Sequence, residues 1–292
     1  MLWDAHLHSS FSGDSDTPME QIIKKAISLN LNGIYFTEHL DYDYPDEPSL
    51  FLLDADSYLK KFSTFKDKYK DQIELGFGIE VGLQPEIANK NNALINSYPF
   101  DFVIGSSHVV HGFDPYYPDF FKDKSEDEAY YEYFESILEN LNSFNNFDVY
   151  GHIDYVVRYG PNTNKFYSYL KFSDIIDEIL KKIINMGKGI ELNTGGFKYG
   201  LGHPNPCEDI IKRYKELGGE IITLGSDAHK CEHVAYDFDK AIQILKDSGF
   251  DFFTIFKERK PIFKKIWLSY WLIIINYSTI LQQINTCTVI EQ

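Results

Sequence analysis

Short apolar segments alternate with amphipathic segments along most of this chain. The apolar segments cover residues 2–5, 33–36, 75–79, 102–104, 148–150, 189–192 and 220–224. Between them, apolar residues recur every three or four positions, which is typical of helices that bury one face. Buried strands that alternate with such helices indicate a parallel sheet of the α/β class.

The first residues of three helices are also predicted. Residues 17–20 (Thr-Pro-Met-Glu) form a capping box with Pro at the first helical position, and residues 125–128 (Ser-Glu-Asp-Glu) form a second box. Ser173 begins a third helix. Its apolar stripe comprises Ile175, Ile176, Ile179 and Leu180. Seven strands with no obvious reversal favour a closed barrel over an open sheet.

Length and charge narrow the class of protein. The chain has 292 residues, of which 43% are hydrophobic and 16% aromatic, which suits a single α/β barrel with a large core. Its formal net charge of −16 argues against a nucleic-acid partner, because duplex binding needs clustered Lys and Arg. A small anionic substrate is still compatible with this charge, since bound divalent cations invert the local field.

The cysteines and the first residues bear on location. Cys207, Cys231 and Cys287 form no CxxC pair, so we expect free thiols in a reducing, cytoplasmic environment. Residues 1–4 lack the basic and apolar regions of a signal peptide.

The last residues differ from the rest, because no charged residue occurs from 266 to 290. This length would permit a membrane span, but Asn and Gln residues dilute the segment. We favour either a terminal helix or strand that packs on the domain, or a tail foreign to it, over a membrane anchor. The predicted division is therefore a barrel domain at 1–265 and an apolar tail at 266–292.

Polar side chains follow nearly every predicted strand. In strand order they are His6, His8 and Asp14; Glu38 and His39; Glu80; His108; His152; Glu191 and Asn193; Asp227 and His229. The carboxyl ends of barrel strands meet at one mouth, and imidazole with carboxylate suits Zn, Fe or Mn. His6 and His8 would point to the same side of an extended segment and hold one ion together, and Glu80 could bridge two. Any one histidine could instead hydrogen-bond inside the barrel, but burying the whole set without metal is costly.

Six segments, HLHSSFSGDSD, FTEHLDY, GIEVGL, GSSHVVHG, YGHIDYVVRYG and LGSDAH, resemble the motifs of the polymerase and histidinol phosphatase (PHP) superfamily. The resemblance covers roughly residues 1–264 and is closest to the bacterial histidinol-phosphatase branch. It implies a distorted (β/α)7 TIM-like barrel with three divalent transition-metal ions, in some mixture of Zn, Fe and Mn. The metal ligands that it implies are His6, His8, Asp14, His39, Glu80, His108, His152, Asp227 and His229.

The resemblance also implies a reaction. A metal-bridging hydroxide would attack the phosphorus of a phosphomonoester, and Asp227 or His229 would protonate the leaving alkoxide. Arg158 matches a phosphate contact of the family, although it could also be an ordinary surface ion-pair residue. Some members carry a second Arg after the sixth strand, where this chain offers Lys198. The Lys198 ammonium is a point charge and cannot hold two phosphoryl oxygens as a planar guanidinium does. The identity of the substrate is therefore left open.

Three functions follow from these observations. The first is hydrolysis of L-histidinol phosphate to L-histidinol and phosphate in histidine biosynthesis. The second is a PHP-family phosphoesterase that acts on another small phosphomonoester, such as a sugar phosphate or nucleotide. The third is a metal-storing or scaffold protein tethered by its tail. None of the metal ligands that the resemblance implies is missing, which favours the two enzymatic functions over the third. The identity of the metals and the oligomeric state are left open.

Overall fold

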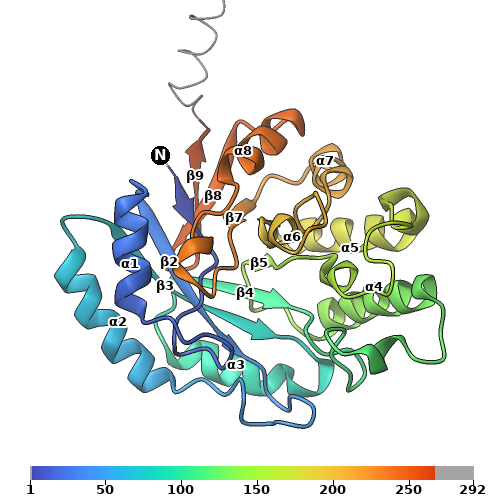
Figure 1. Ribbon diagram of the computed structural model, residues 1–292, viewed down its shortest axis with the longest axis horizontal. Coiled ribbons are helices and arrows are strands. Elements are labelled where there is room, and N and C mark those ends of the chain that lie inside the picture. Colours follow the sequence, from blue (N-terminus) through green and yellow to red (C-terminus); the bar gives the residue numbers. More distant parts are fainter. Residues whose placement is uncertain (1, 267–292) are drawn as a thin grey trace, which may run out of the picture.

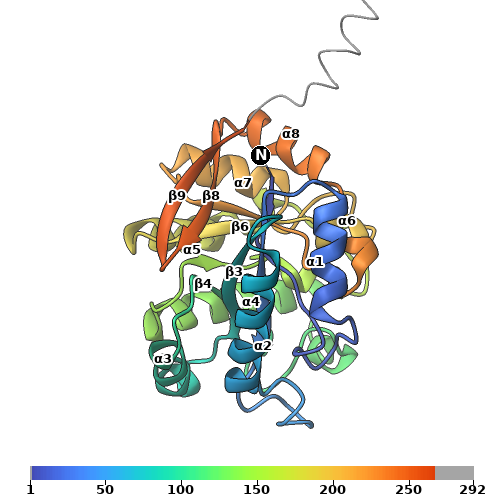
Figure 2. The same ribbon diagram turned by 90° about the vertical axis from the view of Figure 1, so that its left-hand side faces the viewer.

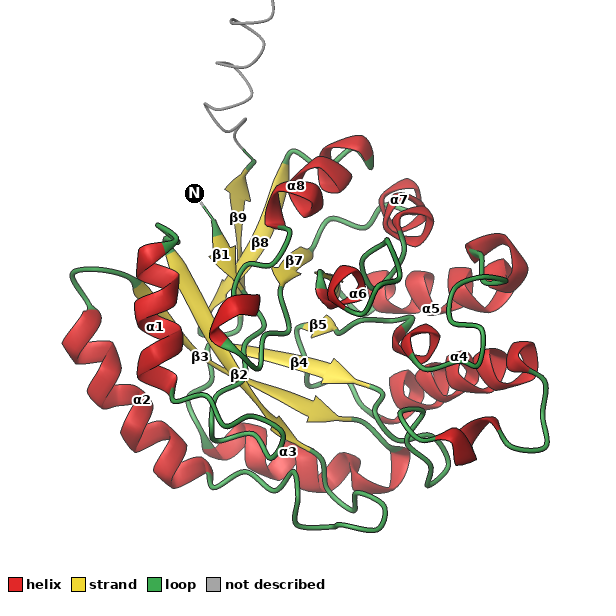
Figure 3. Ribbon diagram, in the orientation of Figure 1, coloured by secondary structure: helices red, strands yellow, loops and turns green. Residues whose placement is uncertain are grey.

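The computed structural model describes residues 2–266, which fold into a sheet of seven parallel strands surrounded by helices (Figures 1 and 3). The strands are hydrogen-bonded in chain order. They are β1 (Trp3–Asp4), β2 (Gly33–Leu40), β3 (Glu74–Gly82), β4 (Phe102–Ser106), β5 (Val149–Tyr150), β6 (Gly189–Asn193) and β7 (Ile222–Gly225). The amide of Ala5 donates to Leu224 O at 2.8 Å, and Leu7 bridges to Ala228, so the last strand meets the first. The predicted distorted (β/α)7 barrel is confirmed.

Helices cover the outside of this barrel. The α-helices are α1 (Met19–Ser28), α2 (Ala55–Tyr69), α3 (Ala88–Ser97), α4 (Glu126–Ser143), α5 (Ser173–Asn185), α6 (Gly195–Lys198), α7 (Glu208–Glu216) and α8 (Phe238–Asp247). The short 3-10 helices are η1 (Pro85–Ile87), η2 (Pro118–Phe121), η3 (Tyr155–Arg158), η4 (Tyr169–Phe172) and η5 (Cys231–His233). Helices α1, α2, α4, α5, α7 and α8 each bury an apolar face, as a spacing of three to four residues predicts, whereas α3 buries only Asn91 and Ile95.

Two of the three predicted helix starts are confirmed. Ser125 and Glu128 form the reciprocal capping box of α4. Helix α5 begins at Ser173, and its predicted stripe is buried. The capping box at 17–20 is wrong, because α1 begins at Met19 without a side-chain cap. The Thr17 hydroxyl donates instead to the His229 carbonyl at 2.8 Å, so it ties the first helix to the loop after β7.

An antiparallel hairpin of β8 (Phe252–Lys257) and β9 (Lys260–Lys265) follows the barrel, and it was not predicted. Its two strands lie side by side in Figure 2. The hairpin packs on the amino-terminal end of the strands, where the Phe256 ring stacks on Phe102 at 5.0 Å between centroids. The amide of Phe256 donates to the Tyr35 hydroxyl at 2.9 Å. The hairpin therefore closes the end of the barrel opposite the mouth.

The predicted tail at 266–292 lies outside the described residues, apart from Ile266, as does Cys287. The division at residue 265 therefore stays a prediction. None of the helices within residues 2–266 has the length and hydropathy needed to cross a membrane. Cys207 and Cys231 are free thiols.

Candidate metal centre

The carboxylate of Glu80, near the end of β3, lies at the centre of the barrel mouth. It is fully buried. Its Oε2 atom lies 3.0 Å from His6 Nε2, 3.4 Å from His8 Nε2 and 3.1 Å from His39 Nδ1. These histidines come from the loop after β1 and from β2, so side chains from two neighbouring strands of the barrel face the same oxygen.

The second oxygen of Glu80 faces the other side of the mouth. Its Oε1 atom lies 3.3 Å from His108 Nε2 and 3.0 Å from His152 Nε2. The Ser106 hydroxyl donates to the same oxygen at 2.6 Å. The structure thus brings five of the predicted histidines to one carboxylate, with one group of imidazoles on each oxygen.

Asp14, Asp227 and His229 complete the ring of predicted ligands. Asp14 Oδ2 lies 3.0 Å from His229 Nε2 and 3.7 Å from His39 Nε2. Asp227 Oδ1 lies 3.6 Å from His8 Nε2. Asp227 is also held at φ 54°, a left-handed conformation that costs free energy in a non-glycine residue and that is concentrated at functional sites.

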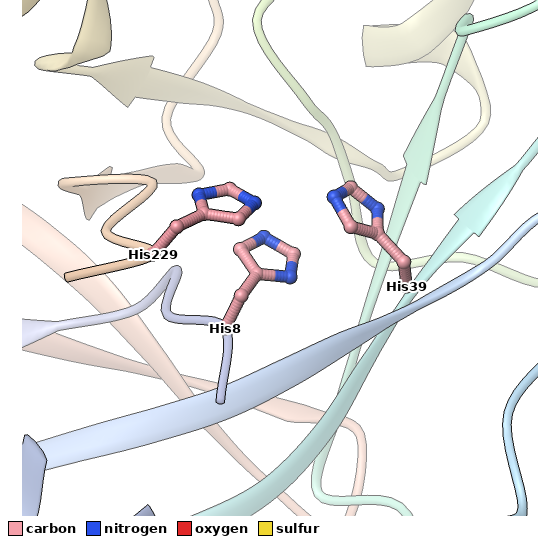
Figure 4. Close-up of side chains that lie close together, drawn as sticks. All are labelled: His8, His39 and His229. Carbon is pink, nitrogen blue, oxygen red and sulfur yellow. The ribbon is translucent and has the colours of Figure 1, made fainter. Parts of the chain in front are cut away.

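Three of these imidazoles, those of His8, His39 and His229, lie close together (Figure 4). The His8 ring stacks on His39 at 4.1 Å and on His229 at 4.3 Å between centroids. The atoms His8 Nε2, His39 Nδ1 and His229 Nε2 are buried and make no hydrogen bond of good geometry, although each has a carboxylate oxygen of Glu80 or Asp14 at 3.0–3.4 Å. Buried nitrogen lone pairs without a donor are costly unless they bind a cation. The donor set therefore fits divalent transition metals, which imidazole and carboxylate bind together.

The imidazoles and carboxylates of the mouth shift one another's pKa values. Burial lowers the pKa of His8 well below its usual value, and the nearby His39 and His229 lower it further, so His8 is a neutral imidazole. Burial alone would raise the pKa of Glu80, but His6 and His108 hold that pKa well below its usual range. Burial would lower the pKa of His6, His39 and His108, but the neighbouring carboxylates outweigh burial and raise the pKa of all three imidazoles. Because neutral imidazole and ionised carboxylate are the states that bind metal, binding at these three histidines would release protons.

A carboxylate behind His6 fixes the orientation of its ring. Glu191 of β6 lies 2.7 Å from His6 Nδ1 and accepts a hydrogen bond from the amide of His152 at 3.1 Å. A Cβ atom on Gly225 would lie only 2.1 Å from Glu191 Oε1, so this close approach requires glycine. A carboxylate on the far nitrogen selects the tautomer that leaves Nε2 free for metal.

Two further positioning groups, Asp41 and Ser12, were not predicted. Asp41 Oδ1 lies 2.8 Å from His108 Nδ1, and the Ser12 hydroxyl lies 3.1 Å from His8 Nδ1. Ser12 donates in turn to Glu38 at 2.7 Å. Asp41 follows His39 by two positions and could have been found from the alternation that pairs His6 with His8. Nothing in the sequence singles out Ser12.

Arg158, on η3, is buried beside these groups and is not a surface residue. Its Nη1 atom donates to Asp227 Oδ2 at 3.1 Å, Nη2 to Asn193 Oδ1 at 3.0 Å and Nε to Asn205 Oδ1 at 2.8 Å. The guanidinium also lies 4.9 Å from the centroid of the Tyr199 ring. The side chain is therefore fixed in position next to the predicted metal ligands.

Lys198, at the end of α6, reaches the same place. Its Nζ donates to the Asp227 carbonyl at 2.8 Å. Burial lowers the pKa of this ammonium, whereas Asp227 opposes that effect. The two predicted phosphate contacts, Arg158 and Lys198, thus both lie against Asp227.

A cavity opens over this ring of side chains. It is lined by Asp14, His39, Asp41, Tyr44, Phe51, His108, Asp114, His152, Tyr155, Arg158, Tyr159, Tyr199, Asp227 and His229. A larger groove between α4 and α5 is lined by none of these residues. We place the site in the smaller cavity, because the crowded imidazoles, the carboxylates and the guanidinium meet there.

The chain matches the family model of the PHP domain over residues 4–195. It is 35% identical over 250 residues to a protein of Clostridium acetobutylicum named as a probable histidinol-phosphatase, covering 85% of this chain and 94% of that protein. It is 33% identical over 261 residues to the histidinol-phosphatase of Lactococcus lactis, covering 88% of this chain and 95% of that enzyme.

A solved structure is similar over the same extent. The crystal structure of the L. lactis histidinol phosphate phosphatase, in complex with zinc, L-histidinol and phosphate, has a TM-score of 0.84 and 33% sequence identity. The similarity covers 89% of this chain and 98% of that structure.

Proposed function

This chain belongs to the PHP domain family, and on that premise we propose that it is a histidinol-phosphatase, which hydrolyses L-histidinol phosphate to L-histidinol and phosphate. The observation that carries this function is the position of Arg158, a buried guanidinium against Asp227 at the rim of the histidine ring. A planar cation beside a metal-binding donor set suits a phosphoryl group, since it can hold two phosphoryl oxygens at once.

The metal ligands of this proposal are the nine residues of the ring. They are His6, His8, Asp14, His39, Glu80, His108, His152, Asp227 and His229. We assign three ions of the Zn, Fe or Mn class to them, because three sets of donor atoms lie close together, two of them sharing Glu80. Bound ions would supply Lewis-acid stabilisation of the phosphoryl oxygens and would lower the pKa of a coordinated water.

The residues of the chain bind and orient the ester. Arg158 and Lys198 hold the phosphate, and Asn193 and Asn205 keep the guanidinium in place. Hydrolysis breaks the bond between phosphorus and the ester oxygen, and the leaving alkoxide needs a proton. Either His229, or Asp227 after it has accepted a proton from the attacking water, donates that proton, because both side chains line the cavity.

A second candidate is hydrolysis of another small phosphomonoester, such as a sugar phosphate or a nucleotide. Lys198 favours it, because an ammonium replaces the second guanidinium that some members carry. A substrate panel separates the two candidates. A clear preference for L-histidinol phosphate in kcat/KM supports the first, and its absence supports the second.

The test starts from protein purified without chelator, in which metal content and phosphate release are measured on one sample. We expect bound transition metal, and turnover of L-histidinol phosphate that chelator abolishes and added metal restores. His8→Gln should lose both metal and turnover. His233→Gln, on η5 outside the cavity, is the matched control and should keep both. Bound metal without turnover of any phosphomonoester would contradict the proposal.

A further inference from the structure

A buried carboxylate behind Arg158 has no part in the roles assigned above. Asp154, the residue before η3, is fully buried and is not among the residues that line the cavity. Its Oδ1 atom accepts a hydrogen bond from Asn205 Nδ2 at 2.6 Å. Its Oδ2 atom accepts one from the amide of Cys207 at 2.9 Å and one from the Tyr167 hydroxyl at 3.2 Å. All three donors are neutral groups, so in these contacts the carboxylate acts as a hydrogen-bond acceptor.

Asn205 connects this carboxylate to the guanidinium of Arg158. Its side-chain amide has one donating end and one accepting end, and it is fully buried. Nδ2 faces Asp154, and Oδ1 accepts from Arg158 Nε at 2.8 Å. Because an ionised carboxylate only accepts and a guanidinium only donates, a single orientation of the amide satisfies both neighbours.

Only one of the three contacts of Asp154 requires a second acceptor. The Cys207 amide and the Tyr167 hydroxyl both bind Oδ2, and the single oxygen of an asparagine side chain would accept both. The contact with Asn205 uses the other oxygen. An NH2 group in its place would leave two buried donors facing each other, either at Asn205 Nδ2 or, after this amide turns over, at Arg158 Nε.

The orientation of Arg158 decides what it offers to a ligand. A guanidinium carries five N–H groups. Three of them donate to Asn205, Asn193 and Asp227. One N–H group on each of Nη1 and Nη2 is then left for a ligand, and two such groups can donate to two phosphoryl oxygens. If Nε loses its acceptor, the plane that holds these two groups is no longer fixed.

We propose that Asp154 is a positioning residue for phosphate binding, which sets the orientation of the Asn205 amide and through it that of the Arg158 guanidinium. The inference rests on the proposed function for the phosphate at Arg158, and it makes no use of the alcohol part of the ester. A change at Asp154 should therefore weaken all phosphomonoesters alike, because the group that they share is the one that Arg158 holds.

The first test is Asp154→Asn, which keeps the shape of the side chain and one oxygen. We expect kcat/KM to fall about 10- to 100-fold, equally for L-histidinol phosphate and for p-nitrophenyl phosphate. The inhibition constant of inorganic phosphate should rise about tenfold. Metal content should stay unchanged, because none of the three donors to this carboxylate is a proposed metal ligand.

The second test exchanges the two side chains. Asn205→Asp alone brings two carboxylates face to face and should also lose activity. In the double variant Asp154→Asn/Asn205→Asp, the amide at position 154 donates to the carboxylate at position 205, whose other oxygen accepts from Arg158 Nε. We expect kcat/KM to return to within about threefold of the wild type, because the two changes are coupled. Losses that multiply in the double variant would overturn the proposal. The exchange also covers the case in which Asp154→Asn alone fails to fold.

A matched control separates positioning from stability. Asp148 is also buried, and it accepts from the amide of Val103 at 2.8 Å and from Arg259 Nε at 2.6 Å, on the side of the β8–β9 hairpin. Asp148→Asn should lower the midpoint of urea denaturation and leave the inhibition constant of phosphate unchanged. If Asp154→Asn behaves in the same way, its carboxylate serves the fold alone and the proposal is refuted.

Failure of the proposed function has a different signature. It would be seen in the wild type, as the absence of a preference for L-histidinol phosphate within a panel of phosphomonoesters. The role of Asp154 is read from inorganic phosphate, by inhibition or by calorimetric binding to the metal-loaded protein, and needs no natural substrate. A wild type that does not bind inorganic phosphate, or equal affinities in the wild type and Asp154→Asn, would contradict this role.

Discussion

The two ends of the barrel are built from the same strands but from opposite kinds of residue. On β2, Tyr35 holds the hairpin at the closed end through the amide of Phe256, and four positions later His39 faces Glu80 at the mouth. On β4, Phe102 stacks on Phe256, and Ser106 donates to Glu80. Each strand thus contributes packing at its start and chemistry at its end, so that the rigidity of the first positions the second.

This comparison predicts that changes at the two ends affect different measurements. The largest effect is expected at the mouth. Glu80→Gln removes the charge that five imidazoles share, so we expect loss of bound metal and a fall in kcat of about 10³-fold or more, as for several kcal/mol of lost transition-state stabilisation. Circular dichroism should stay unchanged, because β3 keeps its backbone hydrogen bonds. Unfolding of this variant would show that the mouth contributes to stability as well as to activity, contrary to this prediction.

At the closed end we expect the reverse. Phe256→Ala removes a ring that is 4% exposed, and it should lower the free energy of unfolding by about 3–5 kcal/mol. Urea denaturation measures this loss. The kcat per folded molecule at 25 °C should equal that of the wild type. A large fall in kcat with little loss of stability would show that the hairpin communicates with the mouth.

A smaller effect should follow from a change to a residue that contacts one of the proposed metal ligands. Glu191→Gln keeps the shape of the side chain but weakens the hold on His6 Nδ1, which should lower metal affinity about 10- to 100-fold. Competition with a chelator of known affinity measures this change. Saturating metal should restore most of the activity, which it should not do for Glu80→Gln.

The smallest effect is expected on the outer helices, away from both ends. Arg213 of α7 donates to both oxygens of Asp177 on α5, at 3.0 and 2.6 Å, and these hydrogen bonds lower the pKa of Asp177 from 3.8 to about 2. A lowered pKa stabilises the fold fully above about pH 4. This contribution is lost as the pH falls towards 2.

Because water screens this pair, Asp177→Asn should cost less than about 1 kcal/mol at pH 7. The difference from the wild type in urea denaturation should shrink at pH 3. A constant difference between pH 3 and pH 7 would mean that packing, and not charge, accounts for the contribution of Asp177.

The mouth was more predictable than the closed end for a physical reason. Polar residues just past apolar strands stand out in a sequence, so Glu80, His152 and Asp227 were found from the pattern alone. The turn of the hairpin lies at Glu258 and Arg259, which have φ values of 50° and 64°. Asn or Gly usually occupies such positions and indicates the turn in a sequence, but neither occurs here. The hairpin was therefore missed.

The partners of the site residues were the least predictable. Thr17 matched a capping box, yet its hydroxyl bonds to the His229 carbonyl, because a partner 212 positions away in the chain competes with the local one. Asp114 belongs to an insert with no regular period, and only the fold brings it to the cavity. Such long-range partners depend on tertiary structure that no local pattern records.

The contacts between the first and last strands of the barrel constrain when the site can form during synthesis of the chain. Ser226 donates to Asp4 across 222 positions, and the amide of Asp227 donates to the carbonyl of His6 at 2.9 Å. The donors on either side of the mouth therefore meet only when β7 has left the ribosome. A nascent chain would carry His6 and His8 long before Asp227 and His229 exist, so the two sets of donors can come together only after β7 has been synthesised.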